Sequence, residues 1–596
     1  MRKKKMGRFS AVLFTITLMI MTCFSIRPAQ AEGEENNVLR VGVFNEIESI
    51  NPLVAYSTSA YEVFKLNYNL LITWDENLNP IPELAKDWTV SEDGQEWTFH
   101  LQEGVKWHDG QPFTSADVKF TFEYIRDNTI GYFYDYVSKM TAIETPDEHT
   151  VTIVTEQPLS WMPQIWVPIL PKHIWENIDP AEASSTYPNE DPIGTGPFTL
   201  GEYKKGEYCR LIANPDYFKG APKINEVIFK IFANESTAAE ALKLGEVDIL
   251  TKMSAVPFNS LEGQENIKTL YSNSAGFTEI VVNHWADSQS KGNPLLRDKN
   301  IRKAMSYAID RQYLIDAVTF GYGEIGTTLV PPMFKSWHYE PTPGEMHNFD
   351  LEKAKQILED AGYKDGNGDG VREGSDGSPL DFRLTLRSES AEQQKMGRII
   401  AEWWKQIGIN ITIDVVDSGT LTDRLYDNGD FDMYIWTYFM DVDPTSILKI
   451  MTTDQIMSWN DSFYSNPVYD DLFIKQDQEM DKEKRREIIY EMQRIIYDDC
   501  PYIILAYGPE LEAYRTDRFE GWVRTPVDGT VLMTHSMATY ENLAPIAQAA
   551  TQEATGEESA PPEAGKSSTW IWVLVIVAAI AGSILVSRRK KKDIDD

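Results

Sequence analysis

The sequence has very little cysteine. Its 596 residues include three, and Cys23 lies in the apolar N-terminal stretch, which leaves Cys209 and Cys500. Two cysteines cannot form a disulfide scaffold; they could pair, but their apolar neighbours favour two buried thiols. Motifs of common enzymes are also missing, since there is no HExxH, Gly-x-Ser-x-Gly elbow, P-loop or dinucleotide fingerprint. We therefore expect no catalytic residues, no enzymatic activity and no organic cofactor.

Basic residues are few relative to acidic ones. There are 56 Lys and Arg against 91 Asp and Glu, which gives a formal net charge of −35 at pH 7. A surface of this sign repels polyanions. Nucleic acid and anionic lipid are therefore disfavoured as partners.

The N-terminus has the composition of a secretory signal peptide. Basic residues precede an apolar stretch, and Ala29-Gln30-Ala31 is a small-residue cleavage pattern. We predict a signal peptide over residues 1–31. Lipidation of Cys23 is the alternative, which Thr22 immediately before it disfavours.

The C-terminal region predicts a membrane anchor. Residues 569–587 carry no charge and would span about 28 Å as a helix, close to the thickness of a bilayer core. Five basic residues follow, which favours a cytoplasmic tail over residues 588–596. Residues 544–568 are rich in Ala, Glu, Pro and Ser and predict a disordered stalk. The expectation is a single-pass protein of the cell membrane with its globular part outside the cell.

Between these ends, strand and helix patterns alternate without a repeat of about 20–50 residues. Strands are predicted over residues 38–44, 151–155, 226–232, 382–387, 409–416 and 433–436. Helices are predicted over residues 116–127, 236–244, 299–317, 351–361, 391–406 and 482–497. This mixture predicts an α/β protein.

Several motifs occur in one order along the chain. The block Leu84-Ala85-Lys86-Asp87-Trp88 leads through Val90-Ser91-Glu92-Asp93-Gly94 to Glu103-Gly104-Val105-Lys106-Trp107. Asn214-Pro215-Asp216-Tyr217-Phe218 and Ile301-Arg302-Lys303-Ala304-Met305 follow. Together they resemble the family 5 extracellular solute-binding proteins, the peptide, dipeptide and nickel receptors of ABC importers. The Asp93-Gly94 and Gly194-Thr195-Gly196-Pro197 elements are interpreted as turn and backbone geometry of the scaffold.

This resemblance implies a periplasmic-binding-protein-like fold of two lobes, with a large N-terminal lobe that has an extra subdomain, and a hinge. Lobe I would comprise residues 37–287 and 510–543, and lobe II residues 288–509. The implied function is capture of peptides by lobe closure and delivery to ABC transporter permease subunits. An oligosaccharide receptor of the same family is the alternative, because aromatic residues could stack on sugar rings. A surface hydrolase or a surface sensor is a less favoured alternative function.

The predicted ligand strip is residues 431–444. The resemblance implies that an acidic residue here holds the α-amino group of a peptide. Asp441 is the candidate for that role, with Trp436, Thr437 and Tyr438 as pocket residues, although Asp441 and Asp443 could instead cap the following helix. The end of the first strand adds Phe44, Asn45 and Glu46, and Trp285 completes the set.

One segment resembles the start of a calcium loop. Oxygen donors at loop positions 1, 3, 5, 9 and 12 are Asp365, Asn367, Asp369, Glu373 and Asp376. Calcium would be structural there, and an Asp/Gly-rich turn without an ion is the alternative.

Overall fold

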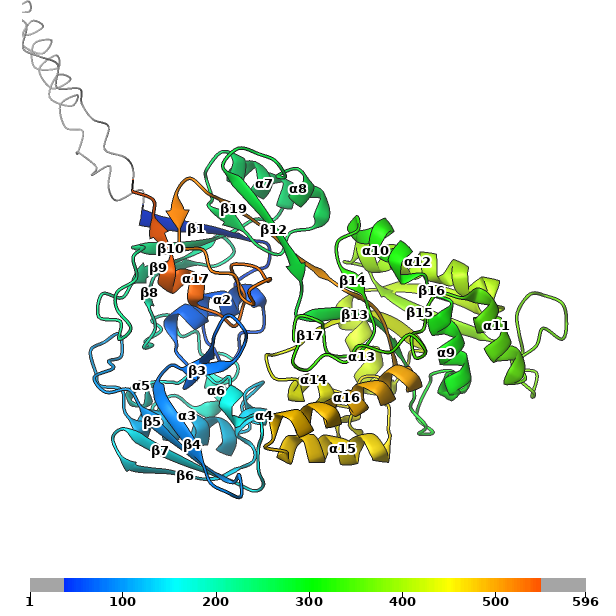
Figure 1. The fold of residues 1–596 in the computed structure, drawn as a ribbon, viewed down its shortest axis with the longest axis horizontal. Helices are drawn as coiled ribbons and strands as arrows, with labels where there is room; N and C mark the ends of the chain where they lie inside the picture. The colour runs from blue at the N-terminus through cyan, green and yellow to red at the C-terminus, as the bar shows by residue number, and fades with distance from the viewer. Residues whose placement is uncertain (1–36, 548–596) are drawn as a thin grey trace, which may run out of the picture. The chain divides into compact units, whose positions relative to one another are not determined.

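The structure, a computed structural model, describes residues 37–547 (Figure 1). The predicted signal peptide, the predicted tail and nearly all of the predicted stalk lie outside this range. So does the predicted membrane span over residues 569–587.

The membrane-anchor prediction is corrected here. Across residues 37–547, no helix is both long enough and apolar enough to cross a bilayer. The predicted C-terminal transmembrane helix and single-pass membrane localisation are therefore not retained, and the described residues form an α/β fold.

The first large sheet has seven strands in the order β12-β19-β11-β1-β10-β9-β8. Their bounds are β1 Val38–Val43, β8 Phe198–Lys204, β9 Tyr208–Ala213, β10 Glu226–Ile231, β11 Ile249–Leu250, β12 Ile267–Asn273 and β19 Pro509–Arg515. Strand β1 pairs in parallel with β10 and β11, so its carboxyl end lies beside theirs. Helix α2 (Thr58–Asn67) contributes to one core, and α7 (Glu235–Lys243) and α8 (Ala255–Asn259) to another.

A four-stranded antiparallel sheet, β4-β5-β7-β6, forms the extra subdomain. It consists of β4 (Ala85–Val90), β5 (Glu96–Leu101), β6 (Met140–Asp147) and β7 (Thr150–Thr155), with helices α3 (Ser115–Asp127) and α4 (Tyr134–Val137). The predicted β4–β5 turn is confirmed, because Gly94 has a φ of +72° and its N–H donates to Ser91 O at 2.9 Å. Gly194 is also structural, since a Cβ there would lie 1.7 Å from Asn67 O.

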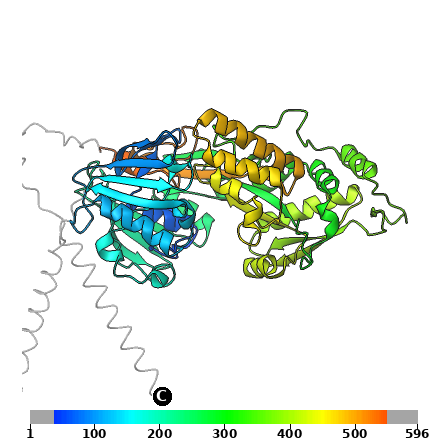
Figure 2. The same ribbon diagram turned by 90° about the horizontal axis from the view of Figure 1, so that it is seen from below.

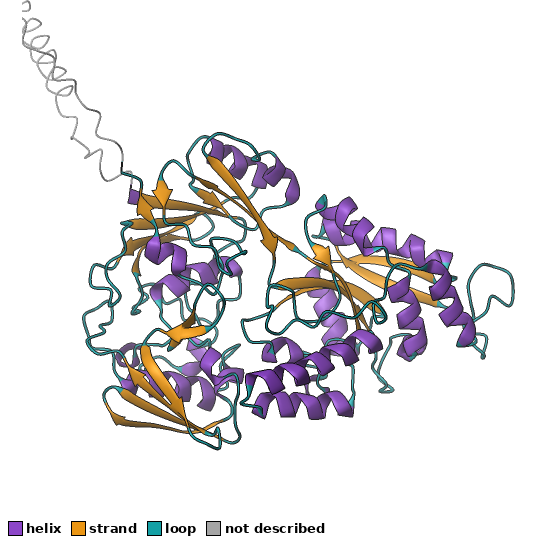
Figure 3. Cartoon of the chain, viewed as in Figure 1, coloured by secondary structure: helices purple, strands orange, loops and turns teal. Residues whose placement is uncertain are grey.

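The second large sheet has six strands in the order β14-β18-β13-β17-β15-β16. Their bounds are β13 Gly276–Val282, β14 Glu324–Ile325, β15 Asp381–Arg387, β16 Asn410–Val416, β17 Met433–Phe439 and β18 Tyr502–Tyr507. Helices contribute to two separate cores, one on each face (Figure 3). The first core holds α9 (Lys299–Tyr307), α10 (Arg311–Thr319), α11 (Leu351–Asp360) and α12 (Ala391–Gln406). The second holds α13 (Ser418–Asn428), α14 (Thr445–Lys449), α15 (Pro467–Gln478) and α16 (Lys482–Asp499), the last two side by side (Figure 2).

The chain passes twice between the two large sheets. It leaves β12 at Asn273 and enters β13 at Gly276, and it returns from β18 to β19 through Gly508. The first crossing lies upstream of the boundary at residue 287 that the sequence suggested. From here on, lobe I means residues 37–273 and 509–547, and lobe II means residues 276–507. Cys209 and Cys500 are buried and unpaired.

Candidate ligand-binding site

Asp441 lies just after strand β17, where lobe II contacts lobe I. Its Oδ2 accepts hydrogen bonds from the hydroxyls of Tyr132 and Tyr136, the second at 2.8 Å. His535 Nε2 lies 3.5 Å from Oδ1. These three partners come from lobe I: Tyr136 lies in α4, Tyr132 just before it, and His535 near the end of the described chain. The predicted anchor residue thus connects segments far apart in the sequence.

The electrostatics keep Asp441 ionised. Burial on its own would raise the pKa of this carboxyl, but the hydrogen bond and charge of His535 and the two tyrosine hydrogen bonds hold it below its ordinary value. Burial, and then the charge of Asp441, raises the pKa of Tyr132 and Tyr136 well above 10.0. Both tyrosines therefore remain protonated donors to a charged acceptor.

Two cavities adjoin this contact, and residues of both lobes line each of them. Cavity A has a volume of about 190 Å³ and is lined on one side by Tyr61, Trp166, Lys252, Glu510 and Met533, and on the other by Met333, Met440 and Asp441. Cavity B, of about 170 Å³, is lined by Tyr136, Lys139 and Trp161 of lobe I and by Tyr438, Ile447, Trp459 and Phe473 of lobe II. Tyr132 and Phe439 line both cavities. Cavities between lobes that combine aromatic walls with a few charged groups are typical of small-solute sites.

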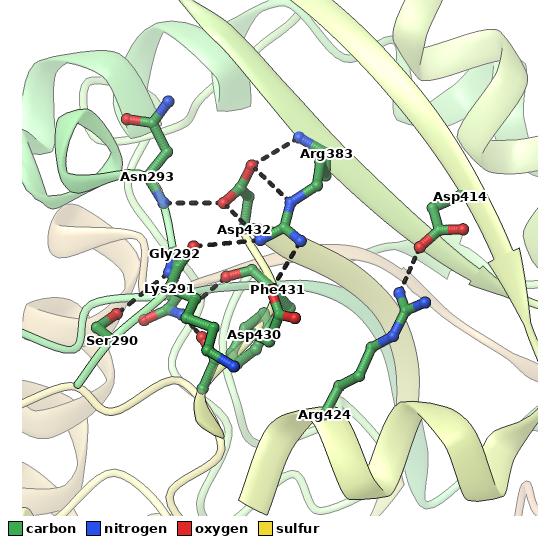
Figure 4. Close-up of polar contacts among 12 residues, drawn as sticks. Ser290, Lys291, Gly292, Asn293, Arg383, Asp414, Arg424, Asp430, Phe431 and Asp432 are labelled. Carbon is green, nitrogen blue, oxygen red and sulfur yellow. Dashed lines mark hydrogen bonds and ion pairs between the residues drawn. The ribbon is translucent and has the colours of Figure 1, made fainter. Parts of the chain in front are cut away.

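Strand β17, which carries the predicted ligand strip, is fixed at its beginning. Asp432 accepts hydrogen bonds from the backbone N–H groups of Asn293 and Arg383, each at 2.8 Å (Figure 4). The guanidinium of Arg383 also donates to Asp430 at 2.8 Å. Because Asp432 is buried, these bonds hold the strand in one register and place Asp441 at its far end.

The predicted pocket residues on β17 lie on two faces of the sheet. Trp436 and Tyr438 share one face, with Arg387 placed 4.4 Å from the Trp436 ring and Tyr438 bonded to Asp461 at 2.9 Å. Thr437 lies on the other face, where its hydroxyl is 3.2 Å from that of Thr278. Of these three, Tyr438 lines cavity B.

The other predicted ligand residues lie elsewhere. Phe44 packs against the core around α7 and α8, and Asn45 and Glu46 are exposed. Trp285 stacks on Phe463, with ring centroids 4.9 Å apart. None of these four is among the residues that line cavity A or cavity B.

Asp443, two residues after Asp441, has a structural environment. Its carboxylate receives two hydrogen bonds from Arg485, at 2.7 and 2.8 Å, and a third from the N–H of Thr445. The side chains of Asp443 and Arg485 are 8 % and 3 % exposed. A bidentate, buried ion pair at the start of α14 matches the alternative interpretation of Asp443 as a helix-capping residue.

A buried acidic pair lies behind β17 and was not predicted. Asp461 accepts hydrogen bonds from Tyr434, Tyr438 and Tyr502. Glu279 on β13, opposite Trp436, is fully buried, and neither of its carboxylate oxygens has a hydrogen-bond partner among the described residues. Burial raises the pKa of Glu279 well above 4.5, the charge of Asp461 adds to the rise, and Arg387 offsets part of it.

The predicted calcium loop brings three of its five donors together. Carboxylate oxygens of Asp365, Asp369 and Glu373 lie within 4.8 Å of one another. Asn367 donates its side-chain amide to Glu373 at 2.6 Å, and Asp376 accepts from Ser378. Three carboxylates with this spacing fit a hard cation such as Ca²⁺.

Comparison with known proteins identifies the family. Residues 79–459 match the bacterial extracellular solute-binding proteins, family 5. The chain belongs to this family. The oligopeptide-binding protein AppA of Bacillus subtilis is 26 % identical over 541 residues, 88 % of this chain and 97 % of that protein. The dipeptide-binding protein of Escherichia coli is 26 % identical over 525 residues, 80 % and 91 % of the two chains.

The solved structures agree. The structure of AppA from B. subtilis in complex with a nonapeptide superposes with a TM-score of 0.71 and 25 % identity, and covers 85 % of this chain and 99 % of that one. The two-lobe fold and the family predicted from the motifs are therefore confirmed.

Four residues that line cavity A or cavity B were not predicted from the sequence, namely Tyr132, Tyr136, His535 and Glu510. Tyr132 and Tyr136 are four residues apart in the aromatic-rich segment Tyr132-Phe133-Tyr134-Asp135-Tyr136, a spacing that places side chains on one face of a helix. That spacing was a usable signal. His535 and Glu510 have no comparable local pattern.

Proposed function

We propose that this solute-binding protein is the receptor of an ABC importer, which captures peptides between its lobes and delivers them to permease subunits. It binds its solute without transforming it. The observation that carries the proposal is the ionised carboxylate of Asp441 beside cavity A, in a chain whose relatives include oligopeptide- and dipeptide-binding proteins.

Asp441 is the proposed anchor for the α-amino group of the peptide. A carboxylate oxygen can accept two hydrogen bonds. Oδ2 already has two tyrosine donors, whereas the one described partner of Oδ1 is His535 at 3.5 Å. A peptide ammonium therefore has an acceptor at Oδ1, and a charge-assisted bond to this half-buried carboxylate is stronger than a neutral one.

Calorimetry with free and N-acetylated peptides tests this proposal. Asp441→Asn should weaken binding of peptides with a free amino group by about 30-fold or more, since an uncompensated charge is left in the cavity. N-acetylated peptides should bind poorly to both proteins. Asp423→Asn serves as the control, because Asp423 is exposed and lines neither cavity.

The possible outcomes distinguish peptide capture by the protein from the anchoring role of Asp441. Binding of oligosaccharides with no binding of peptides would refute peptide capture. Equal affinity for free and acetylated peptides would leave peptide capture standing and refute the role of Asp441.

A further inference from the structure

Cavity A contains a second carboxylate, Glu510, at the beginning of strand β19. Unlike Asp441, its side chain forms no hydrogen bond and no ion pair with any residue in the range 37–547. Glu510 is half-buried, so its carboxylate keeps contact with solvent in the cavity and is free to accept a hydrogen bond from a ligand.

The charged groups around Glu510 do not neutralise it by direct contact. Lys252 lines the same cavity, but its Nζ lies 3.5 Å from Thr534 Oγ1 and forms no ion pair with Glu510. Glu62 on α2 is paired with Lys65 at 2.7 Å. Glu512, two residues along the strand, accepts hydrogen bonds from the N–H groups of Val531 and Leu532. Burial raises the pKa of Glu510; Lys252 opposes this rise and Glu62 adds to it.

We infer that Glu510 binds a second cationic group of the ligand, so that cavity A selects peptides with a basic side chain in addition to a free α-amino group. This inference rests on the proposed function. Two carboxylates, Asp441 and Glu510, line the cavity, against one lysine and one histidine. The histidine, His535, already lies beside Asp441. A ligand ammonium or guanidinium at Glu510 supplies the partner that the protein does not.

The walls of cavity A suit the rest of such a side chain. Phe439, Met440 and Met533 line the cavity. Lysine and arginine side chains have apolar stems with a charged end, and they bind best where an apolar wall leads to an acidic group. The polarizable thioethers of the methionines can adapt to stems of slightly different length.

Matched peptides test this inference on the full chain. The two sets are Ala-Lys and Ala-Lys-Ala, and Ala-norleucine and Ala-norleucine-Ala, in which norleucine keeps the stem and lacks the charge. Calorimetry should show the lysine peptides binding at least about tenfold more tightly. Glu510→Gln should remove that preference and leave the affinity for the norleucine peptides within about twofold. Glu520→Gln, an exposed glutamate that lines neither cavity, should change nothing.

Three results would overturn the inference. Equal affinity for the two sets in the unmodified chain removes the selectivity while leaving peptide capture intact. An equal loss of both sets in Glu510→Gln would make Glu510 a general binding residue. Binding of neither set, to any variant, would refute the proposed function and this inference with it. Glu510→Gln breaks no hydrogen bond or ion pair among the described residues, and an unchanged melting temperature would verify that the variant is folded.

Discussion

Replacement of Glu279 by Gln should stabilise the protein, and the gain should increase with pH. Glu279 is fully buried on β13, and its carboxylate has no hydrogen-bond partner among the described residues. Burial, together with the charge of Asp461, raises its pKa in the folded state well above 4.5. The folded state therefore holds the proton of this carboxyl more tightly than the unfolded state does.

The sign and size follow from proton linkage. A group whose pKa is higher in the folded state than in the unfolded state adds to the unfolding free energy. This contribution is complete below the unfolded pKa and is lost as pH rises toward the folded pKa. While the folded carboxyl stays protonated, each pH unit above 4.5 costs about 1.4 kcal/mol of unfolding free energy. Gln has nearly the same shape and does not titrate. As pH rises from 5 to 7 the variant should therefore gain stability on the native protein, by at most about 3 kcal/mol.

Urea denaturation at pH 5, 6, 7 and 8 measures this difference. Glu487→Gln is the control, because Glu487 is exposed on α16 and is not part of the buried acidic pair. Parallel pH profiles for the native protein and Glu279→Gln would refute the reasoning. They would show that the Glu279 carboxyl has access to water or to a partner in the folded protein.

Two further predictions concern the calcium loop and the contact between the lobes. Calcium should raise the melting temperature in scanning calorimetry, with a stabilisation of about 2.7 kcal/mol at 100 times Kd. Asp369→Asn should abolish this response. Asp376→Asn should retain it, because the Asp376 carboxylate accepts a hydrogen bond from Ser378 instead. No response in the native chain would exclude a structural calcium. Asp477→Ala should lower the unfolding free energy in urea by about 2–4 kcal/mol, because this buried α15 carboxylate accepts hydrogen bonds from Lys139 and Trp161 of lobe I. Asp471→Asn, on the same helix and paired among residues 37–547 only with exposed Lys475, should cost far less, and equal effects of the two would contradict the assignment.

Local signals predicted helices and strands well in lobe II. Helix α12 has the predicted bounds, because Ser390 caps it through the N–H of Gln393 and Gly408, with a φ of +82°, follows its end. The single helix predicted over residues 299–317 is in fact two. Asp310 caps α10 by accepting from the N–H of Tyr313, so the chain turns between α9 and α10. An aspartate inside a helical pattern was the signal that the prediction passed over.

The site was less predictable because it forms from both lobes. Asp441 could be located from the motif that precedes α14, but its partners Tyr132, Tyr136 and His535 meet it only after the chain has folded. The β17 pocket residues show a second limit. Since side chains alternate along a strand, Thr437 cannot share the face of Trp436 and Tyr438. Adjacent residues of one strand therefore cannot all line the same cavity, and the predicted strip included too many of them.

Asp441 and Asp443 are two residues apart, yet their partners suit them to different tasks. Asp443 has a bidentate bond from buried Arg485, and breaking a buried ion pair leaves an uncompensated charge. Asp441 has two neutral tyrosine hydroxyls and a histidine at 3.5 Å. Its Oδ1 therefore has room for a further donor, whereas both oxygens of Asp443 are held by Arg485. Of the two carboxylates, Asp441 is the one suited to the proposed ligand ammonium, and Asp443 holds α14 against α16.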